Sequence, residues 1–142
     1  MPRILASACF RSVHVKEGTH CFDTADTSTS PPDSSCPDEA PGGVPLLDPV
    51  IEHANLSGRE DGLGVAAVGG YVYRGGAVSR LRGRYVFGDW STDFVTRDGT
   101  LFAARPRAQG LWQIQELRIS GDDDGRLGHF VLGMGEDGDG EL

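Results

Sequence analysis

Residues 70–87 read GYVYRGGAVSRLRGRYVF, and this stretch decides the fold class. Two runs of aromatic and β-branched residues, at 71–73 (YVY) and 85–87 (YVF), stand on either side of a glycine-rich connection. Such runs favour β-strands, and the pair Gly75-Gly76 favours a turn. The stretch therefore predicts two neighbouring short strands.

Similar runs continue toward the end of the chain, at residues 100–104, 111–119 and 129–132, with Asp-Gly turn signals between them. Short strands at such regular spacing indicate an antiparallel all-β architecture. In residues 111–119 apolar and polar side chains alternate imperfectly, which predicts a strand that is bulged or buried on both faces. No segment has the periodicity of a long helix.

Composition supports this class and excludes several functions. The 142 residues include 21 glycines and 8 prolines, both of which are poor residues for helix interiors. The net charge is −8, with 13 Lys and Arg against 21 Asp and Glu. Nucleic-acid binding needs clustered basic residues, so the balance argues against it. No apolar run is long enough to span a bilayer, and the N-terminal apolar run is too short for a signal peptide.

The chain divides into three segments by composition. Residues 1–12 form an atypical N-terminus, residues 13–49 are loop-rich in Asp, Ser, Thr, Pro and Gly, and residues 50–142 carry the strand signals. Residues 138–142 (GDGEL) read as a turn and the first residues of a further strand. Because so short a strand cannot complete a ladder, we expect the last segment to be truncated at its end.

Cys21 and Cys36 flank a polar spacer that has no apolar periodicity and needs a clamp. We expect a disulfide between them, which would stabilise a loop of this length by about 3 kcal/mol and indicate an oxidising compartment. Free thiols are one alternative. A metal site that includes His20 is another, although the chain lacks a C-x-x-C pair.

Two further motifs have simpler explanations. Residues 62–67 (GLGVAA) match a dinucleotide-binding pattern, but a polar segment precedes them and a strand signal follows, so we predict a glycine-rich connection. The Asp-rich stretches 122–125 and 137–141 lack the ligand spacing of an EF-hand, and Asp-Gly favours turns; calcium binding is the alternative. Residue types alone supply no complete catalytic constellation.

Several segments, taken in order, resemble the C-terminal part of the glucose/sorbosone dehydrogenase family. They are residues 69–76 (GGYVYRGG), 81–90 (LRGRYVFGDW) and 133–142 (GMGEDGDGEL), preceded by the similar segments 15–23 (VKEGTHCFD) and 45–52 (PLLDPVIE). The resemblance covers roughly residues 13–142. It implies a partial β-propeller, with about two of six blades of four antiparallel strands each.

The resemblance also implies a function for the full-length protein. The family are secreted or periplasmic sugar oxidoreductases that use pyrroloquinoline quinone (PQQ) and calcium. Their catalytic histidine and calcium loops lie in earlier blades, so we assign no catalytic or metal-binding residue and expect this chain alone to be inactive. The cofactor-binding positions match Ser91 and His129, with Arg74 as a further candidate. Because Ser91 and His129 are not permanent cations, a non-catalytic β-propeller binding module is the alternative.

Overall fold

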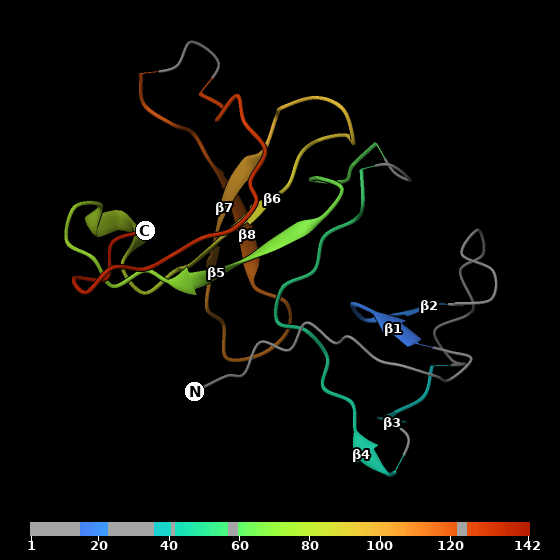
Figure 1. Cartoon of the computed structure of the whole chain (residues 1–142). Helices are drawn as coiled ribbons and strands as arrows, with labels where there is room; N and C mark the ends of the chain where they lie inside the picture. Colours follow the sequence, from blue (N-terminus) through green and yellow to red (C-terminus); the bar gives the residue numbers. More distant parts are fainter. Residues whose placement is uncertain (1–14, 23–35, 41, 57–59, 122–124) are drawn as a thin grey trace. The chain divides into compact units, whose positions relative to one another are not determined.

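The computed structural model describes residues 15–22, 36–40, 42–56, 60–121 and 125–142 (Figure 1). The chain forms two compact units, Met1–Glu52 and His53–Leu142. The atypical segment 1–12 and the Asp-rich residues 122–124 lie outside the described residues. Within the described part of the chain, no helix is long and apolar enough to cross a membrane.

The described residues of the first unit form two small antiparallel hairpins. Strand β1 (Val15–Glu17) pairs with β2 (His20–Phe22), and β3 (Glu39–Ala40) pairs with β4 (Val44–Pro45). The turn between β1 and β2 uses Gly18, whose φ of 67° favours glycine.

A disulfide and the side chain of Glu52 are among the contacts that join distant parts of this unit. Cys21 and Cys36 form a disulfide with a Cα–Cα distance of 5.2 Å, which confirms the predicted clamp. The Glu52 carboxylate accepts a hydrogen bond from the Thr19 N–H at 2.7 Å and lies 3.0 Å from the His20 Nε2. Residues next to Glu52 are thereby tied to the β1–β2 hairpin, although they are more than thirty positions away along the chain.

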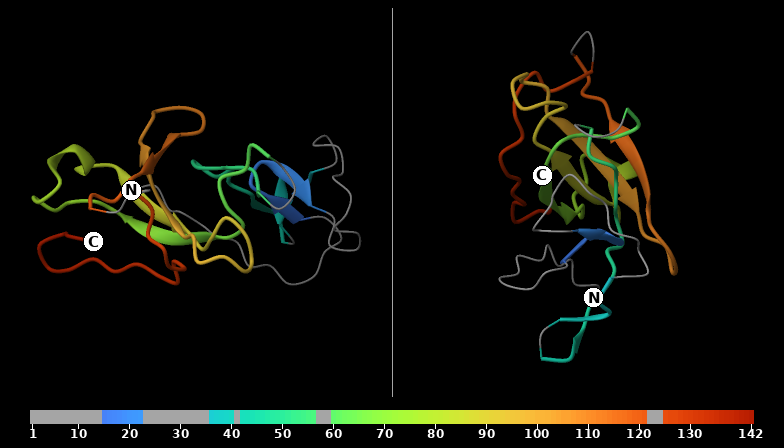
Figure 2. Two further views of the ribbon diagram at one scale, coloured as in Figure 1. Left: turned by 90° about the horizontal axis from the view of Figure 1, so that it is seen from above. Right: turned by 90° about the vertical axis from the view of Figure 1, so that its right-hand side faces the viewer.

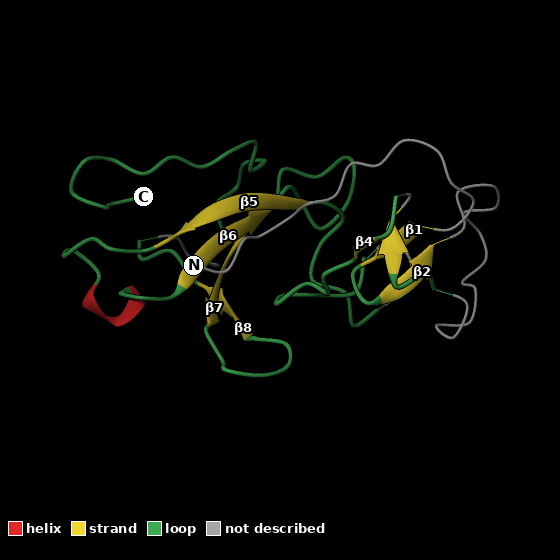
Figure 3. Cartoon of the chain, turned by 90° about the horizontal axis from the view of Figure 1, so that it is seen from below, coloured by secondary structure: helices red, strands yellow, loops and turns green. Residues whose placement is uncertain are grey.

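The second unit contains one four-stranded antiparallel sheet, in which β5 (Ala67–Val72), β6 (Tyr85–Asp89), β7 (Thr100–Arg105) and β8 (Gln113–Leu117) lie in chain order. Figure 3 shows these strands with the single 3-10 turn η2 (Ser79–Leu81) of the described chain. The predicted all-β class and the antiparallel four-stranded blade are confirmed, and the chain has the form of a partial β-propeller. The described residues hold one complete blade; a second blade stays a prediction.

Strand β6 is the core of the sheet, because all five of its residues are buried. Its side chains alternate between the two faces. Val86 packs with Tyr73 and Ala103 on one face. On the other, Phe87 stacks on Phe102 with ring centroids 5.3 Å apart. Burial of an aromatic side chain of this size contributes roughly 2–3 kcal/mol.

A β-bulge interrupts β5 rather than β8. Val68 pairs with Gly88 and Tyr71 pairs with Val86, so two glycines of β5 oppose a single residue of β6. A Cβ atom at Gly70 would lie 1.8 Å from the Val86 carbonyl oxygen, which explains why glycine is required there. Strand β8 keeps regular register with β7 and exposes its polar side chains, so the bulged or doubly buried strand predicted for residues 111–119 is wrong.

The C-terminal residues run along the sheet without forming a strand within 125–142 (Figure 2, red). The strand predicted at residues 129–132 is therefore wrong. Its backbone instead bonds to the connection between β6 and β7: the Gly99 N–H donates to His129 O at 2.8 Å, and the Val131 N–H to Trp90 O at 3.2 Å. These two hydrogen bonds are isolated and do not form the continuous ladder of a β-strand.

The chain end is held by the side chain of Glu141. One carboxylate oxygen accepts the N–H groups of Gly76 and Ala77 at 2.7 and 2.8 Å, and the other accepts the Tyr73 hydroxyl at 2.5 Å. These hydrogen bonds lower the pKa of Glu141, and the bond from Tyr73 has the largest effect. Burial, followed by the hydrogen bond to Glu141, raises the pKa of Tyr73. The turn predicted before this residue is present, with the Gly140 N–H donating to Asp137 O.

Candidate functional site

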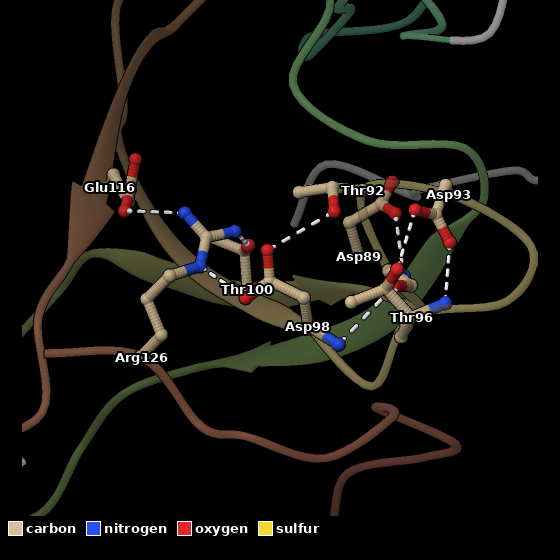
Figure 4. Close-up of polar contacts among 9 residues, drawn as sticks. Asp89, Thr92, Asp93, Thr96, Asp98, Thr100, Glu116 and Arg126 are labelled. Atoms are coloured by element: carbon tan, nitrogen blue, oxygen red, sulfur yellow. Dashed lines mark hydrogen bonds and ion pairs between the residues drawn. The ribbon is translucent and has the colours of Figure 1, made fainter. Parts of the chain in front are cut away.

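A dense polar cluster surrounds the connection between β6 and β7, residues 90–99, called here the β6–β7 loop (Figure 4). Inside the loop, one oxygen of Asp93 accepts the N–H groups of Val95 and Thr96, and the other accepts the Thr96 hydroxyl at 2.6 Å. These bonds from Thr96 and Val95 lower the pKa of Asp93. They fix the backbone of the loop tip in one conformation.

Ser91 braces the base of the same loop. Its side chain is buried, its hydroxyl donates to the Thr96 carbonyl, and it accepts the Asp98 N–H at 3.3 Å. A single hydroxyl therefore connects the two ends of the loop across five to seven residues. A group that is buried and bonded in this way has a structural role.

Arg126 joins the loop to the edge of the sheet. Its guanidinium donates through Nε to the Asp98 carboxylate and through a terminal nitrogen to the Thr100 hydroxyl at 2.7 Å. A second terminal nitrogen lies 3.6 Å from a carboxylate oxygen of Glu116 on β8 (Figure 4). The other Asp98 oxygen accepts the Thr92 hydroxyl at 3.1 Å. The planar fork of an arginine suits such a bridge between several acceptors.

Asp89, the last residue of β6, is the most deeply buried acid of the described residues, with no exposed surface. Its Oδ1 accepts three backbone N–H groups, those of Val65, Ala66 and Ser91, at 2.9 to 3.2 Å. Its Oδ2 has no hydrogen-bond partner among the described residues and faces the His53 Nε2 at 3.8 Å. The carboxylate thus ties the start of β5 to the end of β6.

Aromatic packing completes the support of the loop and leaves its tip exposed. Trp90 stacks on Phe130 with ring centroids 4.7 Å apart and contacts Phe94 at 5.8 Å in a tilted arrangement. Phe94 is nevertheless 65% exposed, and the neighbouring Val95 is 86% exposed. Two apolar side chains are therefore presented to solvent on a loop that polar contacts hold in place.

The three predicted cofactor-binding residues do not gather around one space. Ser91 is buried and occupied as a brace. His129 is exposed beside the same loop. Arg74 lies beyond the opposite end of β5 and β6, next to the backbone bond between Tyr73 and Arg84, and pairs with Glu136 at 3.0 Å.

Ser91, His129 and Arg74 do not together form one site for PQQ. A desolvated tricarboxylate requires cations or N–H donors. The groove beside His129, about 350 Å³ in volume, is otherwise lined by leucine, valine, phenylalanine, methionine and glycine. Among the described residues, no three His, Cys, Asp or Glu side chains could hold a metal ion together.

The exposed apolar tip of the β6–β7 loop was not predicted from the sequence. The signal that could have found it is Asp93 followed three positions later by Thr96, since Asp commonly accepts hydrogen bonds from backbone just after it.

The glycine-rich stretch 62–67 does form a connection that leads into β5, with Gly64 bridged to Asn55. A Cβ atom at Gly64 would lie 2.0 Å from the Asp89 carboxylate carbon, so this glycine makes room for the buried acid.

Fold and site together define an all-β protein with a propeller-type blade and a braced, apolar-tipped loop. The chain is 39% identical over 77 residues to Hedgehog-interacting protein of Homo sapiens and 38% identical over 78 residues to that of Mus musculus. Each alignment covers 53% of this chain and 10% of the relative, so the chain spans about a tenth of the length of the curated relatives it matches. No family model and no solved structure matches.

Proposed function

We propose that the chain is part of a non-catalytic β-propeller module that binds another protein. The observation that carries this proposal is that the polar side chains around the β6–β7 loop form hydrogen bonds within the protein. Asp93, Ser91 and Arg126 bond to the loop backbone or to neighbouring side chains, and so hold the shape of a surface. A fixed surface with exposed apolar side chains is suited to recognition rather than to turnover.

The relatives support a protein partner. Both are named for an interaction with Hedgehog, and this chain shares more than a third of the aligned residues with them. We therefore take a Hedgehog signalling domain as the partner of this module. The Cys21–Cys36 disulfide suits an oxidising compartment, and we propose that the protein is secreted or extracellular.

A PQQ-dependent sugar dehydrogenase of the glucose/sorbosone family is the second candidate for the full-length protein. The order of the glycine- and tyrosine-rich motifs between residues 69 and 142 favours it. The separation of Arg74 from Ser91 and His129 weighs against it, because the three side chains offer no common cofactor surface. Blades of this kind occur both in enzymes and in binding modules, so the two candidates are distinguished by the functional site and not by the fold.

One set of measurements separates the two candidates. The full chain is immobilised, and binding of a Hedgehog signalling domain is followed by biolayer interferometry; the same chain is assayed for dye reduction with aldose, PQQ and calcium. The binding module predicts saturable binding of the domain and no dye reduction above blank. No binding would refute the Hedgehog partner, and sugar-dependent dye reduction would refute the non-catalytic function.

A further inference from the structure

The β6–β7 loop has the properties of a docking element. Phe94 and Val95 are adjacent in the chain, and both residues are mostly exposed, at 65% and 86%. Large aromatic side chains at the centre of an interface commonly supply much of the binding free energy. A lone exposed apolar residue needs no explanation, but two at the tip of one braced loop form a compact apolar projection.

The bracing is what distinguishes this loop from an ordinary mobile connection. Asp93 holds the tip, with its carboxylate accepting the Val95 N–H at 2.7 Å. Ser91 holds the base, and Trp90 supports the Phe94 ring from the side while it stacks on Phe130. A loop already fixed in its bound shape loses less conformational entropy on binding, so more of the contact free energy appears as affinity.

We propose that the β6–β7 loop inserts Phe94 and Val95 into an apolar pocket of a partner protein that has a basic surface around that pocket. The basic character follows from charge complementarity with the chain as a whole, which carries a net charge of −8; the loop itself carries both an exposed acid, Asp93, and an exposed cation, Arg97. This assignment rests on the proposed function, and names the contact surface of that module.

The test compares variants of the full chain for binding to the same partner domain as above. Phe94→Ser removes the aromatic anchor and is expected to weaken binding by roughly tenfold or more. Val95→Ser should weaken it by a smaller factor. Leu111→Ser is the matched control, because Leu111 is also an exposed apolar residue but lies in the β7–β8 connection, at the other end of the sheet; its affinity should equal that of the wild type.

A second pair of variants tests the bracing. Asp93→Ala removes the acceptor of Val95 and Thr96 while both apolar side chains stay, and should weaken binding because the loop must then be ordered on contact. Asp93→Asn retains an acceptor oxygen and should restore most of the affinity. Melting temperatures confirm that each variant is folded. Higher ionic strength should slow association, as expected for attraction between opposite charges.

The outcomes are distinguishable. Wild-type binding with unchanged affinity in Phe94→Ser and Val95→Ser overturns the docking loop and leaves the binding function standing. Absence of wild-type binding overturns the proposed function itself, and the docking loop with it. If sedimentation shows that the wild type dimerises and Phe94→Ser is monomeric, the loop contacts a second copy of this chain and the partner assignment is wrong.

Discussion

At the scale of single residues, the fold depends on a few polar side chains that accept hydrogen bonds from backbone N–H groups. Asp89 is the strongest case, since one oxygen accepts three backbone N–H groups in a place without solvent. Buried N–H groups cost free energy when they lack an acceptor, so this carboxylate is needed at the junction of β5 and β6.

We therefore expect Asp89→Ala to lower the free energy of unfolding by about 3 kcal/mol, because the N–H groups of Ala66 and Ser91 lose this acceptor and that of Val65 keeps only the Ser91 carbonyl at 3.1 Å. Asp89→Asn keeps an oxygen in the same position and should lower it much less. Chemical denaturation followed by tryptophan fluorescence measures both. Equal losses in the two variants would show that the negative charge, rather than the acceptor geometry, is required.

At the scale of elements, the bulge shapes β5, and the Glu141 contacts fix the segment that follows it. The bulge places two glycines opposite one residue of β6 and lets the Gly70 N–H reach the Tyr85 hydroxyl at 3.0 Å. The Glu141 side chain holds the segment after β5 through Tyr73 and the backbone of residues 76 and 77.

The two glycines of the bulge provide a matched pair of variants. Gly70→Ala places a Cβ atom against the Val86 carbonyl and should destabilise the fold by about 2 kcal/mol, as overpacked cores commonly are. A Cβ atom at Gly69 meets nothing within 4 Å, so Gly69→Ala should be neutral or slightly stabilising. Thermal unfolding of both variants checks this, and an equal loss would contradict the register described for β5.

The Tyr73–Glu141 pair predicts a pH dependence with two limbs. The pKa of Glu141 is lowered from 4.5, so its stabilisation is complete above that pH and is lost as the pH falls through the lowered value. The pKa of Tyr73 is raised from 10.0, so its stabilisation is complete below pH 10.0 and is lost as the pH rises through the raised value.

Tyr73→Phe should abolish the alkaline limb and reduce the acid limb, since Glu141 loses its first hydrogen-bond donor. Glu141→Gln should reduce the acid limb to the part that Asp93 contributes, because the pKa of Asp93 is lowered as well. The free energy of unfolding measured across the acid and alkaline ranges tests these expectations. An alkaline limb that persists in Tyr73→Phe would mean that another group titrates there.

At the scale of the whole molecule, the chain consists of two units with different means of support. The unit before His53 relies on a disulfide and on Glu52, whereas the following unit relies on the hydrophobic faces of its sheet. Local sequence predicted the strands of the sheet well where aromatic and β-branched residues are dense, as in β6 and β7.

Other parts of the structure depend on contacts that local patterns do not contain. Strand β5 begins at Ala67, in a stretch with weak strand propensity, because its pairing with β6 decides its extent. Residues 129–132 have strand-like composition but no strand beside them to pair with among the described residues. The bracing of the proposed docking loop depends in part on Arg126, which bonds to Asp98 from 28 positions away along the chain, and the local pattern does not contain this contact.

Reduction of the disulfide tests the independence of the two units. We expect it to lower the stability of the first unit by about 3 kcal/mol, the value for a loop of this length, and to leave amide protection in β6 and β7 unchanged. Hydrogen exchange followed by mass spectrometry, with and without reductant, gives both quantities, and a Cys21→Ser variant controls for the reductant itself. Loss of protection in both units together would show that they unfold as one.

The bulge of β5 also affects how this protein can change length over evolutionary time. A residue lost from a regular strand turns every following side chain to the opposite face, so deletions are normally confined to loops. Here the strand carries one residue more than its partner, and removal of one glycine between Val68 and Tyr71 would leave all four recorded pairs with β6 in place. The strand can therefore lose a single codon at that point while its side chains keep their faces.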